Sequence, residues 1–408
     1  MPFQIALSGL KAASTSLSTT ANNIANVNTA GFKKSRANFV ELFATGLQNV
    51  ASNATGLGAR PSSIQQQFSQ GSLEFTDNNL DLSLVGGGFF SLRDAEGALS
   101  YTRAGNFGVD RNGFVVNDQG LRLQAFPALT GLDTFNTGSL TDLQLDTTDN
   151  PPSETNLITA GFNLPSDAEA PAVPFDPTDP VSYNHTTSVT IFDSLGASRT
   201  ATYYFVKTTD DNVWDVHLRV EGVDLTPVPP PQLQFDTNGE LILPADGNID
   251  FLALDATPAN PNQAISTDFS NVTQFGSTFN VNSLQQDGFS SGRLVSVEIN
   301  PQGVVFARFT NGQSTPLGQL AVTNFTNPEG LENVSDTRWA ETFDSGQALR
   351  GPAGSGNLGS IQAGSLETAN VDLAEELVNM ITAQRTFQAN AQMISTADSI
   401  TQTIINIR

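Results

Sequence analysis

Hydrophobic and small residues recur at helical spacing near both ends of the chain. Between residues 370 and 408, alternating steps of four and three residues meet mostly apolar or small side chains, and neither proline nor glycine interrupts them. The same alternation runs through the first 24 residues. A helix that carries such a stripe needs a partner to cover it. The two stripes therefore predict a coiled-coil-like pair of N- and C-terminal helices.

Both stripes contain polar members and are weak. The C-terminal stripe consists of Leu373, Leu377, Met380, Gln384, Phe387, Ala391, Ile394, Asp398, Thr401 and Ile405. The N-terminal stripe consists of Phe3, Leu7, Leu10, Ser14, Leu17, Ala21 and Ile24. Weak stripes favour helices that become stable only when they pack among copies of themselves. A coiled coil confined to one molecule stays open as the alternative.

From residue 72 the period of the hydrophobic pattern changes to two. Leu80, Leu82 and Leu84 alternate with polar residues, as residues of half-buried strands do. In the turn sequences at 109–114, 235–240 and 299–304, an Asp or Asn is followed by a glycine that can adopt a positive φ. Each of these predicts a β-hairpin, so we expect a mainly β protein with terminal α-helices.

Breaks in these patterns divide the chain into nested parts. The first helix is expected to end in an asparagine cluster, because Asn competes for backbone hydrogen bonds, and Gly31 then stops it. A connector with a short helical piece at 36–45 follows, and prolines between 151 and 180 mark an inserted domain. The predicted parts are a terminal helical domain (1–31 with 366–408), a connector (32–71 with 351–365), a middle β domain (72–145 with 284–350) and an inserted outer β domain (146–283).

The charge balance of the chain is strongly acidic. There are 18 Lys and Arg against 41 Asp and Glu, for a net charge of −23. This argues against nucleic acid and anionic membrane surfaces as partners, because both require basic clusters. The absence of Cys excludes disulfides and thiolate metal sites. The N-terminus lacks the basic and apolar regions of a cleaved secretory signal, and no apolar run is long enough for membrane insertion.

The sequence offers little that suggests catalysis. Its two histidines, His185 and His217, lack metal-ligand spacing. The glycines at 86–88 are not followed by the Lys-Ser/Thr of a phosphate loop, and the turn at 110–113 lacks the acidic ligands of a calcium loop. A pair of carboxylates that could act as acid and base stays open among 41 acidic residues. We expect no enzyme activity, no catalytic residue, no cofactor and no metal site.

Motifs at both ends resemble those of a known family. Ala6-Leu7-Ser8-Gly9-Leu10, Asn22-Asn23-Ile24-Ala25-Asn26 and Thr29-Ala30-Gly31-Phe32-Lys33 resemble the N-terminal signature of bacterial flagellar rod and hook proteins, the axial proteins of the flagellum. Ser365-Leu366-Glu367-Thr368-Ala369-Asn370, Glu376-Leu377-Val378 and Ala383-Gln384-Arg385-Thr386-Phe387 resemble the C-terminal signature. The signature residues that we single out are Asn22, Asn23, Asn26, Gly31, Phe32, Gln384 and Arg385.

Internal motifs favour the hook proteins within this family. Phe192-Asp193-Ser194-Leu195-Gly196 is similar to the inserted domain of hook proteins, and Gln286-Asp287-Gly288-Phe289 to the return into their middle domain. Asn311-Gly312-Gln313 and Phe325-Thr326-Asn327-Pro328-Glu329-Gly330-Leu331 are also similar to hook sequences. Tyr101-Thr102-Arg103-Ala104-Gly105-Asn106-Phe107 is shared with the distal rod protein. Where many relatives carry Tyr, this chain has Phe289 and Phe387, which keep the ring.

The resemblance implies a structural subunit that polymerises into a hollow, bendable tube, a universal joint that transmits torque from rod to filament. The terminal helices would line the channel, the middle domain would form the wall, and the inserted domain would form the outer surface. The subunit would lie outside the cell in the flagellum, after export by the flagellar type III route without a cleaved signal peptide. The implied partners are copies of the chain, the distal rod protein, the hook cap and the hook–filament junction proteins.

The residues expected at subunit interfaces belong to the terminal helices. They are Phe3, Leu7, Leu10, Leu17, Ile24, Leu373, Leu377, Met380, Phe387, Ile394 and Ile405. Two other functions compete with the hook subunit. A distal rod protein would lack the insertion at 146–283. A secreted β-rich surface protein or adhesin would be expected to carry a signal peptide or calcium-binding repeats.

Overall fold

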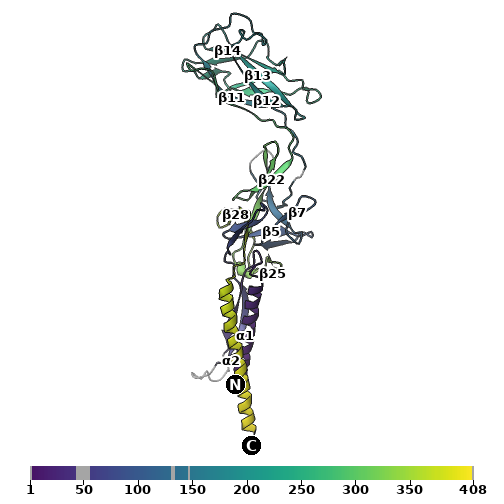
Figure 1. Ribbon diagram of the computed structural model, residues 1–408, viewed down its shortest axis with the longest axis vertical. Helices are drawn as coiled ribbons and strands as arrows, with labels where there is room; N and C mark the ends of the chain where they lie inside the picture. The colour runs from purple at the N-terminus through teal and green to yellow at the C-terminus, as the bar shows by residue number, and fades with distance from the viewer. Residues whose placement is uncertain (1, 43–55, 130–133, 146–147, 407–408) are drawn as a thin grey trace. The chain divides into compact units, whose positions relative to one another are not determined.

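The computed structural model describes residues 2–42, 56–129, 134–145 and 148–406, with side chains from residue 3 to residue 403 (Figure 1). The chain divides into two compact units. The larger unit is built from residues 1–146, 296–307 and 314–408, and the smaller unit from 147–295 and 308–313. The protein is mainly β with one helix near each terminus, which confirms the predicted fold class.

The larger unit carries both helices, α1 (Pro2–Ala25) and α2 (Leu373–Asn406). Its large sheet has the main strand order β22-β23-β24-β9-β5-β6-β26-β25. The strands of this sheet are β5 (Phe89–Arg93), β6 (Leu99–Thr102), β7 (Gly108–Val109), β8 (Val115–Val116), β9 (Arg122–Pro127), β10 (Thr141–Asp142), β22 (Leu294–Ile299), β23 (Val304–Phe309), β24 (Ser314–Asn324), β25 (Glu332–Ser335), β26 (Arg338–Ala340) and β27 (Leu349–Pro352).

Three shorter strand pairs complete the larger unit, and the last two join segments that are far apart in the sequence. They are β1 (Ser35–Glu41) with β2 (Ala59–Gln66), β3 (Leu73–Phe75) with β29 (Ser365–Glu367), and β4 (Leu82–Val85) with β28 (Ser360–Ala363). A short 3-10 helix spans Pro328–Gly330. Because β28 and β29 return from the far end of the sequence to β4 and β3, the chain re-enters this region just before α2.

Two apolar clusters hold the β part of the larger unit together. One gathers aliphatic and aromatic side chains such as Leu84, Phe90 and Val322. The other is aromatic, with Phe89, Tyr101, Phe325 and Trp339 meeting mostly edge to face. Neither cluster includes a described residue of α1 or α2. The β part therefore has a core of its own, independent of the helices.

The smaller unit consists of two sheets around one shared core. The first sheet contains β11 (Leu157–Pro165), β18 (Asn248–Asp250), β19 (Ser266–Asp268), β20 (Thr273–Phe275) and β21 (Asn280–Gln286), with β11 at its centre. The second contains β12 (His185–Phe192), β13 (Ser198–Lys207), β14 (Val213–Val220), β15 (Val223–Asp224), β16 (Gln232–Phe235) and β17 (Leu241–Leu243). Phe162 from the first sheet and Phe205 and Trp214 from the second belong to the same cluster.

The predicted hairpins are confirmed, because their turns depend only on neighbouring residues. The turns at 109–114, 235–240 and 299–304 connect β7 to β8, β16 to β17 and β22 to β23. In the first turn the Asp110 carboxylate accepts hydrogen bonds from the backbone N–H groups of Asn112 and Phe114, and Gly113 has φ +84°. Such an Asx turn with a left-handed glycine is encoded locally.

The predicted short helix at 36–45 is wrong. Residues 35–41 form strand β1, which pairs antiparallel with β2; residues 43–45 lie outside the described part of the chain. The residues of β1 are compatible with either structure, and the deciding factor is the hydrogen-bonding partner at 59–66. The sequence of residues 35–41 alone does not show this partner. Tertiary pairing overrides the weak secondary-structure propensity of the segment.

The smaller unit is expected to lose stability as the pH falls below neutrality. His185 stacks on Phe279 and His217 on Phe175, and burial lowers the pKa of both imidazoles. The unfolded chain therefore takes up these protons first. The stability contribution is complete above the ordinary histidine pKa of about 6.5 and is lost as the pH falls through the lower folded values.

The measurement is chemical denaturation followed by Trp214 fluorescence in a Trp339→Phe background, at about pH 7.5 and about pH 5.5. The unfolding midpoint should be lower at the acidic pH. In the control, His185→Phe with His217→Phe keeps the ring stacking and removes both protons, so most of this pH dependence should disappear. An unchanged pH dependence in the control would contradict the assignment.

Candidate functional site: the terminal helices and their junction with the β part

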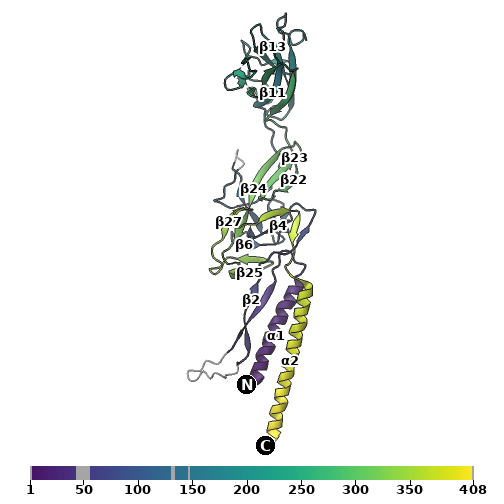
Figure 2. The same ribbon diagram turned by 90° about the vertical axis from the view of Figure 1, so that its left-hand side faces the viewer.

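The two terminal helices pack side by side. The views in Figures 1 and 2 agree in placing α1 along the first part of α2. The strand pair β1–β2 also contacts α1. The prediction that the termini form paired helices is therefore confirmed, although they are the two ends of a 408-residue chain.

Small residues of both helices are buried where α1, α2 and the strand pair β1–β2 pack together. Ala6 and Ala13 of α1 and Ala383 of α2 are buried. Gly9 faces Asn390 so closely that an added Cβ would lie 2.6 Å from the Asn390 Oδ1 atom. Small side chains let two helix backbones approach closely. The close approach of Gly9 to Asn390 shows that the helix backbones lie near each other at this level.

The residues expected at subunit interfaces differ in their exposure within the single chain, and their role between subunits stays a prediction. Phe3 is 51% exposed and Leu377 is 44% exposed, and Leu7 and Leu373 are also exposed. The remaining predicted interface residues with described side chains are half-buried: Leu10, Leu17, Ile24, Met380, Phe387 and Ile394. The side chain of Ile405 lies outside the described residues.

Burial along α2 follows two neighbouring rows. Met380, Phe387 and Ile394 are half-buried, and Glu376 and Ala383 are buried. Leu377 and Gln384, by contrast, are exposed. The enclosed face of α2 therefore includes Glu376 and Ala383 beside the row of Met380.

The asparagine cluster joins the end of α1 to strand β1. The Asn23 side chain is buried, donates from Nδ2 to the Ser35 carbonyl oxygen at 2.9 Å and accepts from the Ser35 N–H at 2.9 Å. Asn26 donates to the Asn22 carbonyl oxygen at 2.9 Å. The side-chain amide of Asn23 therefore pairs with both backbone groups of Ser35, as a residue of a neighbouring strand would. The hydrogen bond between Asn26 and Asn22 closes the last helical turn.

A buried carboxylate holds two cations where the helices meet the β part. Glu367 Oε1 lies 2.6 Å from Lys33 Nζ, and Glu367 Oε2 lies 3.1 Å from Arg103 Nη1. All three side chains are almost completely buried. Further donors of both cations also have partners, since Lys33 donates to the Ser69 carbonyl at 2.8 Å and Arg103 Nη2 to the Gly86 carbonyl at 2.7 Å, whereas the buried Arg103 Nε has none among the described residues.

Burial and charge pairing have opposite effects on the pKa values of the two cations in this triad. Burial lowers the pKa of the Lys33 ammonium, and the adjacent Glu367 carboxylate counteracts that shift. Burial also lowers the pKa of the Arg103 guanidinium, again against the influence of Glu367. Each cation depends on this one anion to remain charged inside the protein. The triad is therefore suited to holding three chain segments together.

Further hydrogen bonds tie the same segments. Asn370 accepts from the Lys34 N–H at 2.7 Å and donates to the Gln67 carbonyl at 2.8 Å. The N–H of Gly31 donates to the Glu367 carbonyl at 2.7 Å, and Phe32 lies half-buried beside it. Segments around residues 31–34, 67–71, 103 and 367–370 thus converge at one junction.

The sequence motifs include the charged residues of this junction, but these residues were not among the predicted site residues. Lys33, Arg103 and Glu367 each lie inside a different signature motif, and Lys33 and Glu367 are 334 positions apart. Lys and Arg are scarce in this chain, 18 in all, so the presence of Lys33 and Arg103 inside signature motifs could have pointed to a charged site. By contrast, the signature residues Gln384 and Arg385 are exposed on α2.

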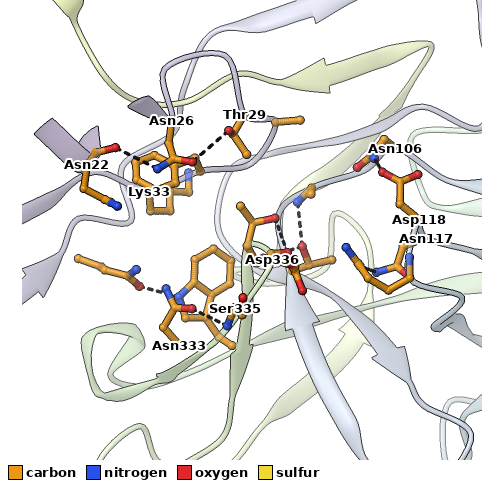
Figure 3. Close-up of a pocket in the computed structure, with 18 residues that line it drawn as sticks. Asn22, Asn26, Thr29, Lys33, Asn106, Asn117, Asp118, Asn333, Ser335 and Asp336 are labelled. Atoms are coloured by element: carbon orange, nitrogen blue, oxygen red, sulfur yellow. Dashed lines mark hydrogen bonds between the residues drawn. The ribbon is translucent and has the colours of Figure 1, made fainter. Parts of the chain in front are cut away.

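A polar pocket of about 540 Å³ lies beside the junction (Figure 3). The end of α1 forms one part of its wall, loops of the β part form the rest, and Trp339 and Phe32 contribute rings. The labelled residues include Asn22, Asn26, Thr29, Asn106, Asn117, Asp118, Asn333, Ser335 and Asp336. Ser335, Asp336 and Thr337 all have positive φ, a strained turn whose Thr337 carbonyl accepts a hydrogen bond from Thr102 Oγ1 at 2.9 Å.

Replacing Gly31 by alanine is expected to destabilise the larger unit by about 2 kcal/mol or more. Gly31 has φ +69°, and a Cβ there would overlap the backbone nitrogen of Ala104. Denaturant unfolding of the full chain, followed at Trp339, measures the loss. Gly97→Ala is the control, because Gly97 has φ +93° with open space around it and reports the backbone term alone. Equal losses in the two variants would contradict a packing role for Gly31.

Protein-family models match most of the chain. The matches are to "Flagella basal body rod protein" at residues 3–33, "Flagellar hook protein FlgE/F/G D1 domain" at 83–173, "Flagellar basal body protein FlaE D2 domain" at 163–289 and "Flagellar basal body rod FlgEFG protein C-terminal" at 362–407. These matches and the nested β fold between paired terminal helices define an axial protein of the bacterial flagellum.

Relatives named as hook proteins align with this chain over almost its whole length. The chain is 39% identical to the flagellar hook protein FlgE of Escherichia coli over 100% of both chains. It is 33% identical to that of Rhizobium meliloti, over 98% of this chain and 97% of the relative, and 32% identical to that of Borreliella burgdorferi, over 98% of each. The chain belongs to the flagellar hook protein FlgE family.

The fold agrees with a solved hook protein. The crystal structure of Helicobacter pylori flagellar hook protein FlgE2 matches with a TM-score of 0.55 at 14% identity, covering 72% of this chain and 100% of that one. The full-length relatives confirm the resemblance found in the sequence motifs, and a distal rod protein is not favoured. Neither helix in the described part of the chain is long and apolar enough to cross a membrane.

Proposed function

We propose that this chain is a structural subunit of the bacterial flagellar hook and that it polymerises into a hollow, bendable tube. In this function the tube is a universal joint that transmits torque from the rod to the filament. Full-length relatives named flagellar hook protein support this function. The chain would act outside the cell, as part of the flagellum, and not as an enzyme.

The observation that carries the proposal is the set of large apolar side chains that the helix pair leaves exposed. Leu373, Leu377, Val378 and Ile381 of α2 are exposed, as are Phe3 and Leu7 of α1. Exposed apolar side chains that gather on one face of a helix mark an interaction site. Because the relatives are hook proteins, further copies of the chain are the partners that this surface fits best.

The residues proposed for contacts between subunits are those of the two predicted stripes. Their exposed members, Phe3, Leu7, Leu373 and Leu377, are free to meet a second copy. The half-buried members, such as Met380 and Phe387, would share their surface between the intramolecular partner and a neighbour. The exposure of these residues thus supports contacts between molecules better than contacts within one.

The proposal also gives each part of the chain a role. We assign residues 1–31 with 366–408 to assembly, 32–71 with 351–365 to a connector, 72–145 with 284–350 to the middle β domain, and 146–283 to the inserted domain. The separate apolar cores of the β parts support folding independent of the helices. The distal rod protein, the hook cap and the hook–filament junction proteins are the proposed partners at the ends of the tube.

Removing residues 1–24 tests the proposal. The full chain should form tubes that are visible by electron microscopy, and the truncated chain should form none, because the partner helix and its exposed apolar residues are lost. The β parts should stay folded, since no described residue of α1 belongs to their cores. Fluorescence of Trp214 and Trp339 is the folding control. Tubes formed by the truncated chain would refute assembly through the helices.

A further inference from the structure

A groove of about 630 Å³ runs between α1, α2 and strand β1. Its lining is mostly small or polar, with Gly9 and Ser16 from α1, Ala383 and Glu376 from α2, and Arg36 from β1. Few large apolar side chains line the groove, and some of its lining side chains are charged. The side chain that stands out is Glu376.

Glu376 is a nearly buried carboxylate without a partner. Its residue is only 5% exposed, and it makes no side-chain hydrogen bond or ion pair with any residue that the structure describes. The neighbouring carboxylate of Glu375 is different, because it lies 3.6 Å from Lys34 Nζ and is mostly exposed. Arg36 is exposed on the same wall and reaches neither carboxylate. The carboxylate faces the groove, and covering it without a counter-charge would be costly, so a partner that fills the groove is expected to bring a cation to it.

Arg385 offers such a cation on another face of the same helix. It is exposed and forms no ion pair within the described part of the chain. At 100° per residue, the nine positions from Glu376 to Arg385 place the two side chains on opposite faces, separated by about 13 Å along the axis. Arg385 continues the row of Leu377 and Ile381, which are also exposed.

We propose that Arg385 of a second copy enters this groove and pairs with Glu376. The inference rests on the proposed function, since it names the contact through which copies assemble. A donor and an acceptor on opposite faces cannot satisfy each other within one molecule or in a closed two-fold dimer. They link copies head to tail, and such contacts produce rings or helical assemblies. Leu377 and Ile381 of the second copy would be covered in the same contact.

Arginine suits this groove better than the other exposed cation of the helix pair. Lys11 lies on α1 and is also exposed without an ion pair among the described residues. The planar guanidinium of Arg385 can bind a carboxylate with two parallel hydrogen bonds, whereas an ammonium cannot. The exposed apolar row beside Arg385 is also the longer one, with Leu373, Leu377 and Ile381. Lys11 therefore provides a matched control.

The test is the critical concentration for tube formation of full-length variants, measured by sedimentation. Glu376→Gln and Arg385→Gln should each raise it about 30-fold or more, because each leaves the other charge without its partner. The double variant should be no worse than the poorer single variant, since both remove one interaction. Glu375→Gln and Lys11→Gln should stay within about twofold of the wild type, as surface changes do.

Mixing charge-reversed chains tests the contact directly. Glu376→Arg and Arg385→Glu should each fail to assemble alone, because each brings like charges together at the contact. An equimolar mixture should assemble, because every groove then meets a complementary neighbour. Additive effects of the two glutamine variants, or a Lys11→Gln effect as large as that of Arg385→Gln, would overturn the proposal. If reversal unfolds the helix, as circular dichroism would show, the glutamine cycle decides alone.

The two levels of inference fail in different ways. If wild-type chains form no tubes under any condition, the proposed function itself fails. If wild-type chains form tubes and the Glu376 and Arg385 variants do so equally well, only the ion-pair contact is overturned. A loss caused by Glu376→Gln and reproduced by Arg36→Gln, but not by Arg385→Gln, would assign the carboxylate to a contact within one chain and would also overturn the proposal.

Discussion

Replacing Glu367 by glutamine is expected to lower the free energy of unfolding of the larger unit by about 3–5 kcal/mol, because it leaves two buried cations without their anion. Lys33 and Arg103 both bind this carboxylate, at 2.6 Å and 3.1 Å. The glutamine amide keeps the shape but can supply only one acceptor and no charge. Denaturant unfolding of the full chain, followed at Trp339, measures the loss.

A matched control lies on the neighbouring strand. Leu366 on β29 is paired with Glu74 on β3, and Glu74 is exposed. Glu74→Gln makes the same chemical change and should alter stability by no more than about 0.5 kcal/mol. Lys33→Met combined with Glu367→Gln should cost less than the sum of the two single changes, because the pair acts as a unit. A loss below about 1 kcal/mol for Glu367→Gln would show that the triad holds little of the junction.

Introducing charge on the exposed face of α2 is expected to abolish tube formation. Leu377→Glu with Ile381→Glu places two carboxylates where apolar side chains are 44% and 49% exposed in the single chain. The folded chain should tolerate both, because neither side chain belongs to a core. An interface between copies should not, since burial of an unpaired charge costs several kcal/mol.

The control for this prediction keeps the surface apolar. Leu377→Met with Ile381→Leu preserves volume and hydrophobicity and should assemble like the wild type. Sedimentation and electron microscopy report assembly, and circular dichroism reports whether α2 still forms. Normal tubes from the glutamate variant would place the contacts between copies elsewhere on the molecule.

Local features of this protein were predictable because their causes are local. The hairpin turns at Asp110 and Asp236 depend on a carboxylate that accepts hydrogen bonds from backbone groups two and four residues later. The helical period at 373–406 and its freedom from proline and glycine likewise belong to one segment. The signature motifs in turn identified the family.

The partners of each segment were not predictable from its own residues. Strand β1 forms because β2 pairs with it, although its sequence permits a helix. Ala13 and Ala383 are buried while Leu7, Leu373 and Leu377 are exposed, because the close approach of two helices depends on the shape of both surfaces together. A stripe pattern shows that a helix has an apolar face, but not which neighbour covers it.

The sequence alone determined the fold class, the helical ends, the hairpins and the family of this protein, since these follow from periodicity, turn chemistry and motifs within single segments. Only the tertiary structure decided that Lys33, Arg103 and Glu367 share one buried site, across separations of 334 and 264 positions. It also decided that Glu376 is enclosed while Leu377 is exposed. The physical reason is that burial and charge pairing are properties of neighbours in space, and those neighbours exist only after the chain has folded.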